Sequence, residues 1–225
     1  MPERDDPSPA IDRPQRTTVH LVRHGEVENP QKLLYGRLPG YHLSALGREM
    51  AELAADYLAQ FDVTHLVSSP LERAQETIAP LAQRLGLDVA IDERVIESDN
   101  RFEGLTVGAD PRQLAHPRYW RLLVNPTRPS WGEPYVELVD RMAAAIRGAR
   151  AAARGHEAVI VSHQLPIWTI RQAAEGRRLW HDPRHRSCSL GSVTSFVFYG
   201  DDLDVIEYAE PAAELLPRAA KVGGA

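Results

Sequence analysis

The sequence predicts an α/β fold: a single domain with a mainly parallel central sheet flanked by helices. Two observations predict it. Short apolar runs typical of buried strands alternate along most of the chain with longer segments whose apolar residues recur at helical spacing. The length of 225 residues is also sufficient for one large domain with a substantial core.

The N-terminal half begins with an apolar run at 17–22, which we interpret as the first strand. Ser44 is a suitable N-cap for a helix, because apolar residues at helical spacing follow it up to Leu58. A second strand is expected at 63–67. Ser69 could then cap a second helix with Pro70 in its first turn, and that helix should end at Gly86.

The middle of the chain predicts a short third strand at 89–91, followed by a loop-rich insertion at about 104–133 that contains many prolines, glycines and aromatic residues. The alanine-rich segment 135–153 predicts a helix, and 158–161 predicts a buried strand. Pro166 could begin the helix that follows this strand.

Two further strands, at 193–198 and 203–207, are expected to form a hairpin around the turn at 200–202. Residues 1–16 are charged and proline-rich, which is typical of a disordered N-terminal tail. We therefore expect one folded domain at 17–209 and a C-terminal tail at 210–225.

The composition excludes several classes of protein. With 26 basic and 31 acidic residues the net charge is −5, which argues against a nucleic-acid binder held by phosphate neutralisation. A basic stretch at 177–186 could attract an anion or be a solvated loop. Cys188 is the single cysteine, so neither an intrachain disulfide nor a cysteine-based zinc site can form.

No apolar run is long enough for a signal peptide or a membrane span, so we expect a cytoplasmic protein with no membrane partner. A homodimer is compatible with the sequence, although no motif predicts it.

Charged residues follow three of the predicted strands directly. Arg23 and His24 follow the first strand, Arg73 lies after the second, and His163 follows the strand at 158–161. Ligands of such sheets bind at the carboxyl ends of the strands, so we expect these side chains to share one catalytic pocket there.

This set of residues suits phosphoryl transfer, in which catalysis consists mostly of positioning and charge stabilisation. Arg23 and Arg73 could each offer a guanidinium fork to phosphate oxygens, and a neutral His24 could attack phosphorus. His163, if protonated, would add a hydrogen bond. One carboxyl could donate a proton to the leaving group and later activate water. Glu97 is the first choice, and Asp99 and Glu103 remain alternatives.

The chain resembles the histidine phosphatase superfamily, in particular its phosphoglycerate mutase-like branch. The segments that carry the resemblance occur in the family's order: LVRHGE (21–26), HLSALG (42–47), SSPLERAQET (68–77), IESDNRFEG (96–104) and VSHQ (161–164). The resemblance implies that His24 is phosphorylated, that Arg23, Arg73 and His163 surround it, that Glu97 donates the proton, and that neither metal nor cofactor is needed.

Two residues depart from the family pattern. Asn29 lies one place closer to the first histidine than the usual asparagine, and Gln164 stands where glycine is common. Both remain candidates for substrate binding. Arg37 and Arg101 could line the substrate pocket, although packing or solvent exposure explains each of them equally well.

The sequence thus predicts a metal-independent phosphomonoester hydrolase that acts on a small phosphorylated substrate through a phosphohistidine at His24. Two alternatives remain. One is a phosphoglycerate mutase that returns the phosphoryl group to a bound acid, and the other is a protein that binds phosphate without turnover.

Overall fold

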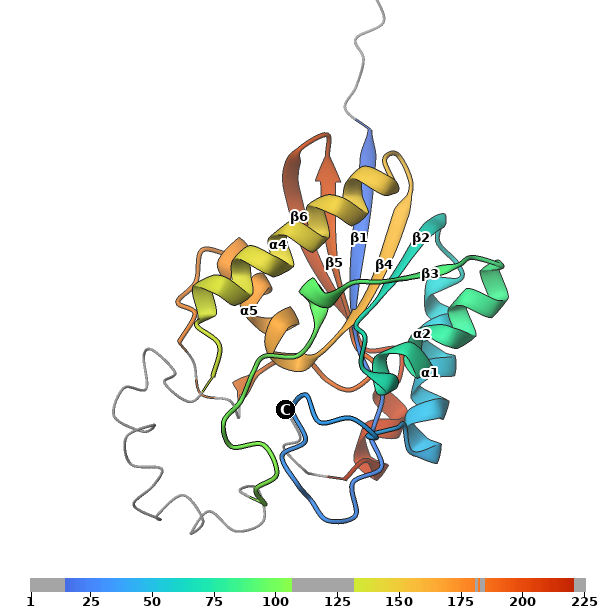
Figure 1. The fold of residues 1–225 in the computed structure, drawn as a ribbon. Helices are drawn as coiled ribbons and strands as arrows, with labels where there is room; N and C mark the ends of the chain where they lie inside the picture. The colour runs from blue at the N-terminus through green and yellow to red at the C-terminus, as the bar shows by residue number, and fades with distance from the viewer. Residues whose placement is uncertain (1–14, 107–131, 181, 183–184, 221–225) are drawn as a thin grey trace, which may run out of the picture.

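The computed structural model describes residues 15–106, 132–180, 182 and 185–220. Within these residues, six strands form one sheet in the order β3-β2-β4-β1-β5-β6 (Figure 1). Their bounds are β1 Arg16–Arg23, β2 Val63–Ser68, β3 Val89–Ile91, β4 Glu157–Ser162, β5 Val193–Tyr199 and β6 Asp202–Ala209. The first four strands of this order pair in parallel, and β5 and β6 are antiparallel additions. The predicted fold class, α/β with a mainly parallel sheet, is confirmed.

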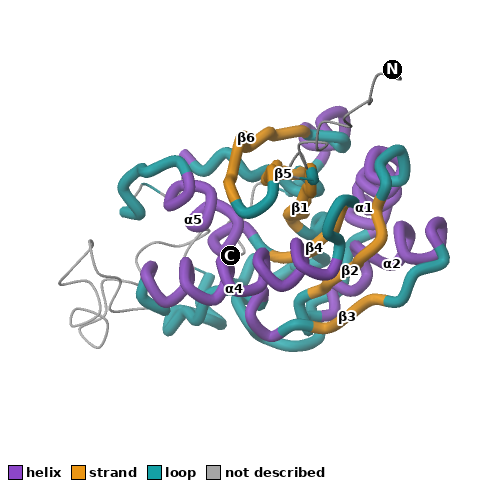
Figure 2. Tube along the Cα trace, turned by 90° about the horizontal axis from the view of Figure 1, so that it is seen from above, coloured by secondary structure: helices purple, strands orange, loops and turns teal. Residues whose placement is uncertain are grey.

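Helices cover both faces of the sheet. The helices α1 (Ala45–Leu58) and α2 (Glu72–Leu85) pack on one face, and α4 (Tyr135–Ala152) and α5 (Gln164–Ala174) pack on the other. Figure 1 shows α4 crossing the near face, and Figure 2 shows the strands between α4 on one side and α1 and α2 on the other.

Strand β4 shows how the sequence builds this three-layer arrangement. Ala158 and Ile160 pack into the core beneath α4 and α5, whereas Val159 and Val161 pack into the core beneath α1 and α2. Successive side chains of a strand point to opposite faces, so a continuous apolar run is what a strand covered on both faces requires.

The start of α1 agrees with the sequence prediction, and the start of α2 does not. Ser44 caps α1, because its hydroxyl accepts the backbone N–H of Gly47 at 2.9 Å. The prediction that Ser69 caps the second helix is wrong: α2 begins at Glu72 with Leu71 at the N-cap. Ser69 belongs instead to the end of the sheet, where its N–H donates to the carbonyl of Val161.

Other boundaries follow the prediction with small shifts. Gly86 ends α2 in the left-handed conformation (φ 65°), which glycine adopts without strain. Gly200 (φ 60°) lies in the β5–β6 hairpin turn. Helix α5 begins at Gln164, two residues before Pro166, so the proline lies in the first turn rather than at the start.

Two short 3₁₀ helices complete the described chain, η1 (Glu93–Val95) and η4 (Ala213–Arg218). The second lies in the segment predicted as a C-terminal tail, where the N–H of Ala220 donates to a carboxylate oxygen of Glu26. Most of the expected N-terminal tail and of the insertion at 104–133 lies outside the described residues. Within the described ranges, no helix is both long and apolar enough to cross a bilayer.

The register of the sheet determines where the candidate side chains emerge. Arg23 pairs with Ser162 at the ends of β1 and β4, and the N–H of His24 continues the ladder by donating to the carbonyl of Ser162 at 3.2 Å. His24 and His163 therefore leave neighbouring strand ends side by side. In Figure 1 the loops that follow β1 and η1 lie together below this edge.

Candidate active site

His24 is fully buried at the end of β1. Its Nδ1 lies 2.7 Å from the carbonyl of Gly25, so this nitrogen carries the proton, and Nε2 has no partner among the described residues. Burial, and then the charges of Arg73 and Arg23, hold the pKa of His24 well below its usual value. The imidazole is therefore neutral near pH 7, with the lone pair of Nε2 available as a nucleophile.

Backbone packing keeps His24 in this position. The N–H of Gly25 donates to the hydroxyl of Thr77 at 3.2 Å, and that hydroxyl donates to the carbonyl of Arg73. A Cβ on Gly25 would lie only 2.4 Å from the carbonyl oxygen of Gly47. The loop after β1 is thus tied to α2 and pressed against the start of α1, as only glycine allows.

Two guanidinium groups flank His24. Arg73, in the first turn of α2, is fully buried: its Nη2 donates to the carbonyl of Gly36 at 2.5 Å, and its guanidinium lies 4.8 Å from the ring centroid of Tyr35. Arg23 donates through Nη1 to the carbonyl of Cys188 at 2.7 Å. The Nε atoms of both arginines, and Nη1 of Arg73, are buried without a described partner. A buried cation in this state gains most from an anionic ligand.

His163 lies beside His24, with 5.2 Å between the ring centroids. Its Nε2 is 2.7 Å from the hydroxyl oxygen of Ser69, and its Nδ1 has no partner in the described part of the chain. Burial, and then the charge of Arg73, hold the pKa of His163 well below its usual value. In the ligand-free protein His163 is therefore neutral, whereas the sequence hypothesis has it protonated by a neighbouring anion.

Of the three carboxyls considered from the sequence, only Glu97 is buried. Asp99 is exposed, and Glu103 accepts the backbone N–H of Arg37 at 2.7 Å. Glu97 accepts the N–H of Ser98 through Oε1 at 2.8 Å, and Oε2 has no described partner. Burial raises the pKa of Glu97, although Arg73, Arg186 and Arg23 oppose the shift. A carboxyl in this state holds its proton to a higher pH than usual.

The structure thus brings the five predicted catalytic residues into one buried cluster. Each has a buried nitrogen or oxygen without a hydrogen-bond partner among the described residues. Buried polar atoms are nearly always paired, so five such residues in one place indicate a polar ligand site. The set contains one nucleophilic nitrogen, three groups of N–H donors and one carboxyl, which matches the needs of a transferring phosphoryl group.

The four remaining substrate-binding predictions have different outcomes. The side-chain amide of Asn29 forms two hydrogen bonds with Leu33 in its own loop: it donates to the carbonyl of Leu33 and accepts the N–H of Leu33. Asn29 also lines a cavity of about 470 Å³ together with Arg23. Gln164 begins α5, where its backbone N–H has no helical partner. Arg37 contacts the backbone of Glu97. Arg101 is exposed on a turn, and no described contact joins it to the cluster.

Sequence reasoning missed several residues around the cluster. Ser69 was interpreted as a helix cap rather than as the partner of His163. Arg186, from the basic stretch 177–186, interacts electrostatically with Glu97. Arg141 and Glu133 contact the loop that carries Glu97, but sequence patterns do not reveal these contacts, because the residues that meet are more than 30 positions apart. Among the described side chains, no group of three or more histidine, cysteine or acidic residues could hold a metal ion.

Comparison with known families gives an independent result. The model of the histidine phosphatase superfamily (branch 1) matches residues 19–211, which is most of the chain. The protein belongs to this superfamily. The resemblance noted from the motifs is therefore confirmed.

Curated relatives of this chain cover most of its length. Uncharacterized protein Rv0525 of Mycobacterium tuberculosis is 54% identical over 200 residues, which are 89% of this chain and 99% of that protein. The probable phosphoglycerate mutase GpmB of Escherichia coli is 32% identical over 181 residues, 78% of this chain and 83% of that protein.

A solved structure of the mycobacterial glucosyl-3-phosphoglycerate phosphatase Rv2419c superimposes with a TM-score of 0.68 at 25% identity. The alignment covers 87% of this chain and 97% of that one. The family and its α/β architecture are therefore shown, and similar proteins carry both phosphatase and mutase names.

Proposed function

We propose that this protein is a metal-independent phosphomonoester hydrolase that works through a phosphohistidine at His24. The observation that carries the proposal is a buried, neutral His24 whose Nε2 has no partner among the described residues, in one cluster with buried N–H donors and a carboxyl whose pKa is raised by burial. We further propose that the substrate is a small phosphorylated molecule of the cytoplasm.

In the first step Nε2 of His24 attacks phosphorus and forms an N–P bond. The bond between phosphorus and the ester oxygen breaks, and the protonated carboxyl of Glu97 gives its proton to that oxygen, so the product leaves as an alcohol. Arg23 and Arg73 donate to the oxygens of the transferring group and stabilise its charge. The raised pKa of Glu97 supports this role, because the acid must be protonated near neutral pH.

In the second step the carboxylate of Glu97 takes a proton from water. The water oxygen attacks phosphorus, the N–P bond breaks, and inorganic phosphate leaves. His24 returns to its neutral form and Glu97 to its protonated form, so the cycle is balanced.

His163 can stabilise the phosphoryl group without carrying a charge. If the Ser69 hydroxyl donates to Nε2 of His163, the ring proton is on Nδ1, the atom that lacks a described partner. The oxygen of Ser69 also accepts the N–H of Leu71 at 3.4 Å, which favours this direction of donation. A neutral imidazole then presents an N–H donor to a phosphoryl oxygen.

Mutase activity is the second candidate, because the probable phosphoglycerate mutase GpmB is 32% identical to this chain. The same phosphohistidine would return its phosphoryl group to a bound acid instead of water. We favour hydrolysis, since the superimposed solved structure is described as a phosphatase. Measuring 2- and 3-phosphoglycerate interconversion beside phosphate release separates the two activities.

The proposal is tested by phosphate release in excess chelator. We expect wild-type activity to persist and His24→Ala to abolish it. His156→Ala is the matched control, because that imidazole is half-exposed and pairs with Asp62 at the protein surface. Equal activity of the wild-type protein and His24→Ala, or activity that requires added metal, would refute the proposal.

A further inference from the structure

Two arginines hold the backbone carbonyl of Glu97. Arg37 donates to it through Nε at 2.6 Å, and Arg141 donates to it through Nη2 at 3.3 Å. Arg37 comes from the loop after β1 and Arg141 from α4, so the two donors reach this carbonyl from separate parts of the fold. Hydrogen bonds from charged donors are stronger than those between neutral groups.

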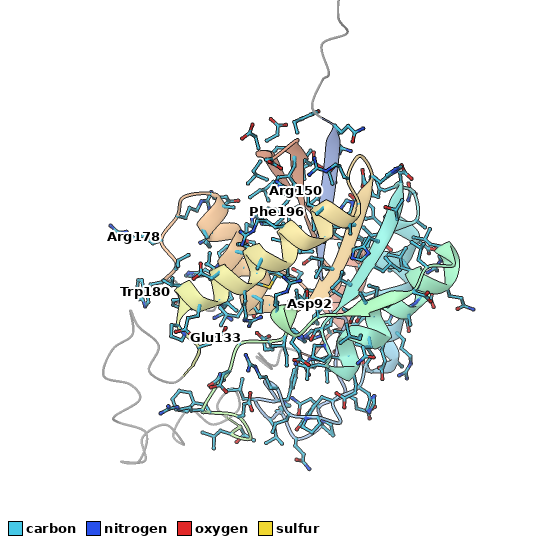
Figure 3. All side chains as sticks on the ribbon, turned by 45° about the horizontal axis from the view of Figure 1, so that its top comes forward. Asp92, Glu133, Arg150, Arg178, Trp180 and Phe196 are labelled. Atoms are coloured by element: carbon cyan, nitrogen blue, oxygen red, sulfur yellow. The ribbon has the colours of Figure 1, made fainter. Side chains whose placement is uncertain are left out.

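One carboxylate joins these two arginines. Glu133 accepts Nε of Arg141 at 2.7 Å through Oε1, and Nη2 of Arg141 at 2.9 Å and of Arg37 at 3.2 Å through Oε2. The Glu133 side chain is only 13% exposed, so these contacts are well shielded from water. Figure 3 shows Glu133 just before the N-terminal end of α4, on the side of the loop that carries Glu97. We call Arg37, Glu133 and Arg141 the acid clasp.

The acid clasp holds one edge of the peptide plane between Glu97 and Ser98. The carbonyl of Glu97 lies at one edge of this plane and the N–H of Ser98 at the other. A trans peptide keeps the two groups antiparallel. The N–H of Ser98 donates to Oε1 of the Glu97 side chain at 2.8 Å. Fixing the direction of the carbonyl therefore fixes the direction of the N–H, which in turn orients the carboxyl.

The rest of the loop is attached to the same elements. Arg141 also donates through Nη1 to the carbonyl of Arg94 at 2.5 Å, and the N–H of Glu133 donates to the carbonyl of Asp99 at 3.3 Å. A Cβ on Gly132 would lie 2.7 Å from that carbonyl, so the two backbones pass as closely as glycine permits. The loop is held on both sides of Glu97, and the two arginines that hold the Glu97 carbonyl share one carboxylate.

We propose that the acid clasp is a set of positioning residues that aim Oε2 of Glu97 at the leaving-group oxygen. The inference depends on the proposed function, because it gives the clasp a role in proton donation. The described contacts of the clasp with Glu97 are all to its backbone, so the clasp acts through the peptide plane rather than on the substrate. Its loss should therefore impair the step that needs the acid and spare the step that does not.

The test compares two substrates that differ in their need for an acid. p-Nitrophenyl phosphate releases a stabilised anion without protonation, whereas glycerol 2-phosphate releases an alkoxide that must be protonated. The measured quantity is kcat/KM, which reports steps up to departure of the leaving group and is unaffected by slow hydrolysis of the phosphoenzyme. Glu97→Gln is the reference variant. Because it lacks the general acid, its kcat/KM for glycerol 2-phosphate should fall selectively, by about 10²–10⁴-fold.

We expect Glu133→Gln to lower kcat/KM for glycerol 2-phosphate by about 10–100-fold, as for a small misplacement of a catalytic group, and for p-nitrophenyl phosphate by less than about 3-fold. Arg141→Lys, which keeps the charge but not the fork that binds Glu133, should show the same selectivity more weakly. Asp201→Asn is the matched control: it removes an exposed carboxylate paired with Arg150, toward the other end of α4 (Figure 3), and should change neither value.

If Glu133→Gln lowers kcat/KM equally for both substrates, or for neither, the inference is overturned, provided that the wild-type protein hydrolyses both. If Glu133→Gln does not fold, Arg141→Lys decides by the same criterion. Failure of the proposed function looks different, because the wild-type protein would then hydrolyse neither substrate.

Discussion

Replacing Glu97 by glutamine is expected to stabilise the folded protein at alkaline pH while impairing catalysis. Burial raises the pKa of Glu97 in the folded protein above its value in the unfolded chain. Such a group stabilises the fold fully below the unfolded pKa, and this contribution is lost as the pH rises through the folded pKa. Glutamine has a similar shape and does not titrate, so the variant should escape this loss.

The size of the effect follows from the surroundings of the carboxyl. Oε1 accepts one N–H, and Oε2 is buried without a described partner, so ionisation leaves one charged oxygen unpaired. An unsatisfied buried polar group costs about 1–3 kcal/mol. In a protein of this size each kcal/mol changes the Tm by about 2–4 °C, so the variant should melt about 2–12 °C higher at alkaline pH.

The assay is thermal unfolding of the wild-type protein and Glu97→Gln from pH 4 to pH 9 without ligand. The difference in Tm should be small at pH 4 and should grow as the pH rises. Asp99→Asn, the same chemical change at an exposed position two residues away, should stay within about 2 °C of the wild-type protein at every pH. A variant that melts at or below the wild-type temperature at pH 9 would refute the reasoning.

Three further predictions test the surroundings of the site. Ser69→Ala removes the hydroxyl that is hydrogen-bonded to Nε2 of His163, and phosphatase assays should show a kcat lowered by about 10–100-fold. Gly25→Ala places a Cβ against the carbonyl of Gly47, and urea unfolding should show a loss of about 1–3 kcal/mol. In Glu157, burial is outweighed by hydrogen bonds from an imidazole and a guanidinium of β1, which lower its pKa. Urea unfolding should therefore show Glu157→Gln to be less stable at pH 7 by about 1–3 kcal/mol, with the difference narrowing as the pH falls below the ordinary glutamate pKa.

Local physical signals account for the parts of the fold that the sequence predicted well. The apolar run at 158–161 is buried on both faces, as its lack of alternation indicates, and Ser44 caps its helix as its position indicates. The predicted start of α2 fails because Ser69 has a stronger tertiary role: its hydroxyl contacts His163, and its backbone extends the sheet. A capping rule cannot anticipate a partner 94 residues away.

In the site, too, some residues could be predicted from the sequence and others depend on tertiary contacts. The positions of Arg23, His24 and His163 follow from parallel strands that end at one edge, so topology alone places them together. The choice among Glu97, Asp99 and Glu103 depends on burial within an irregular loop, which no periodicity reports. Arg37 was singled out as a residue of the pocket wall, yet its contacts are with the loop carrying Glu97 and with Glu133, about 60 and 96 residues away along the chain.

The most direct measurement is detection of the phosphoenzyme itself. Wild-type protein mixed with p-nitrophenyl phosphate and quenched within milliseconds at alkaline pH should carry acid-labile phosphate, and peptide mass spectrometry should locate it on His24. Glu97→Gln should accumulate more of it, because hydrolysis of the N–P bond needs the carboxylate. Phosphate on another residue, or turnover without any covalent phosphoenzyme, would contradict the account.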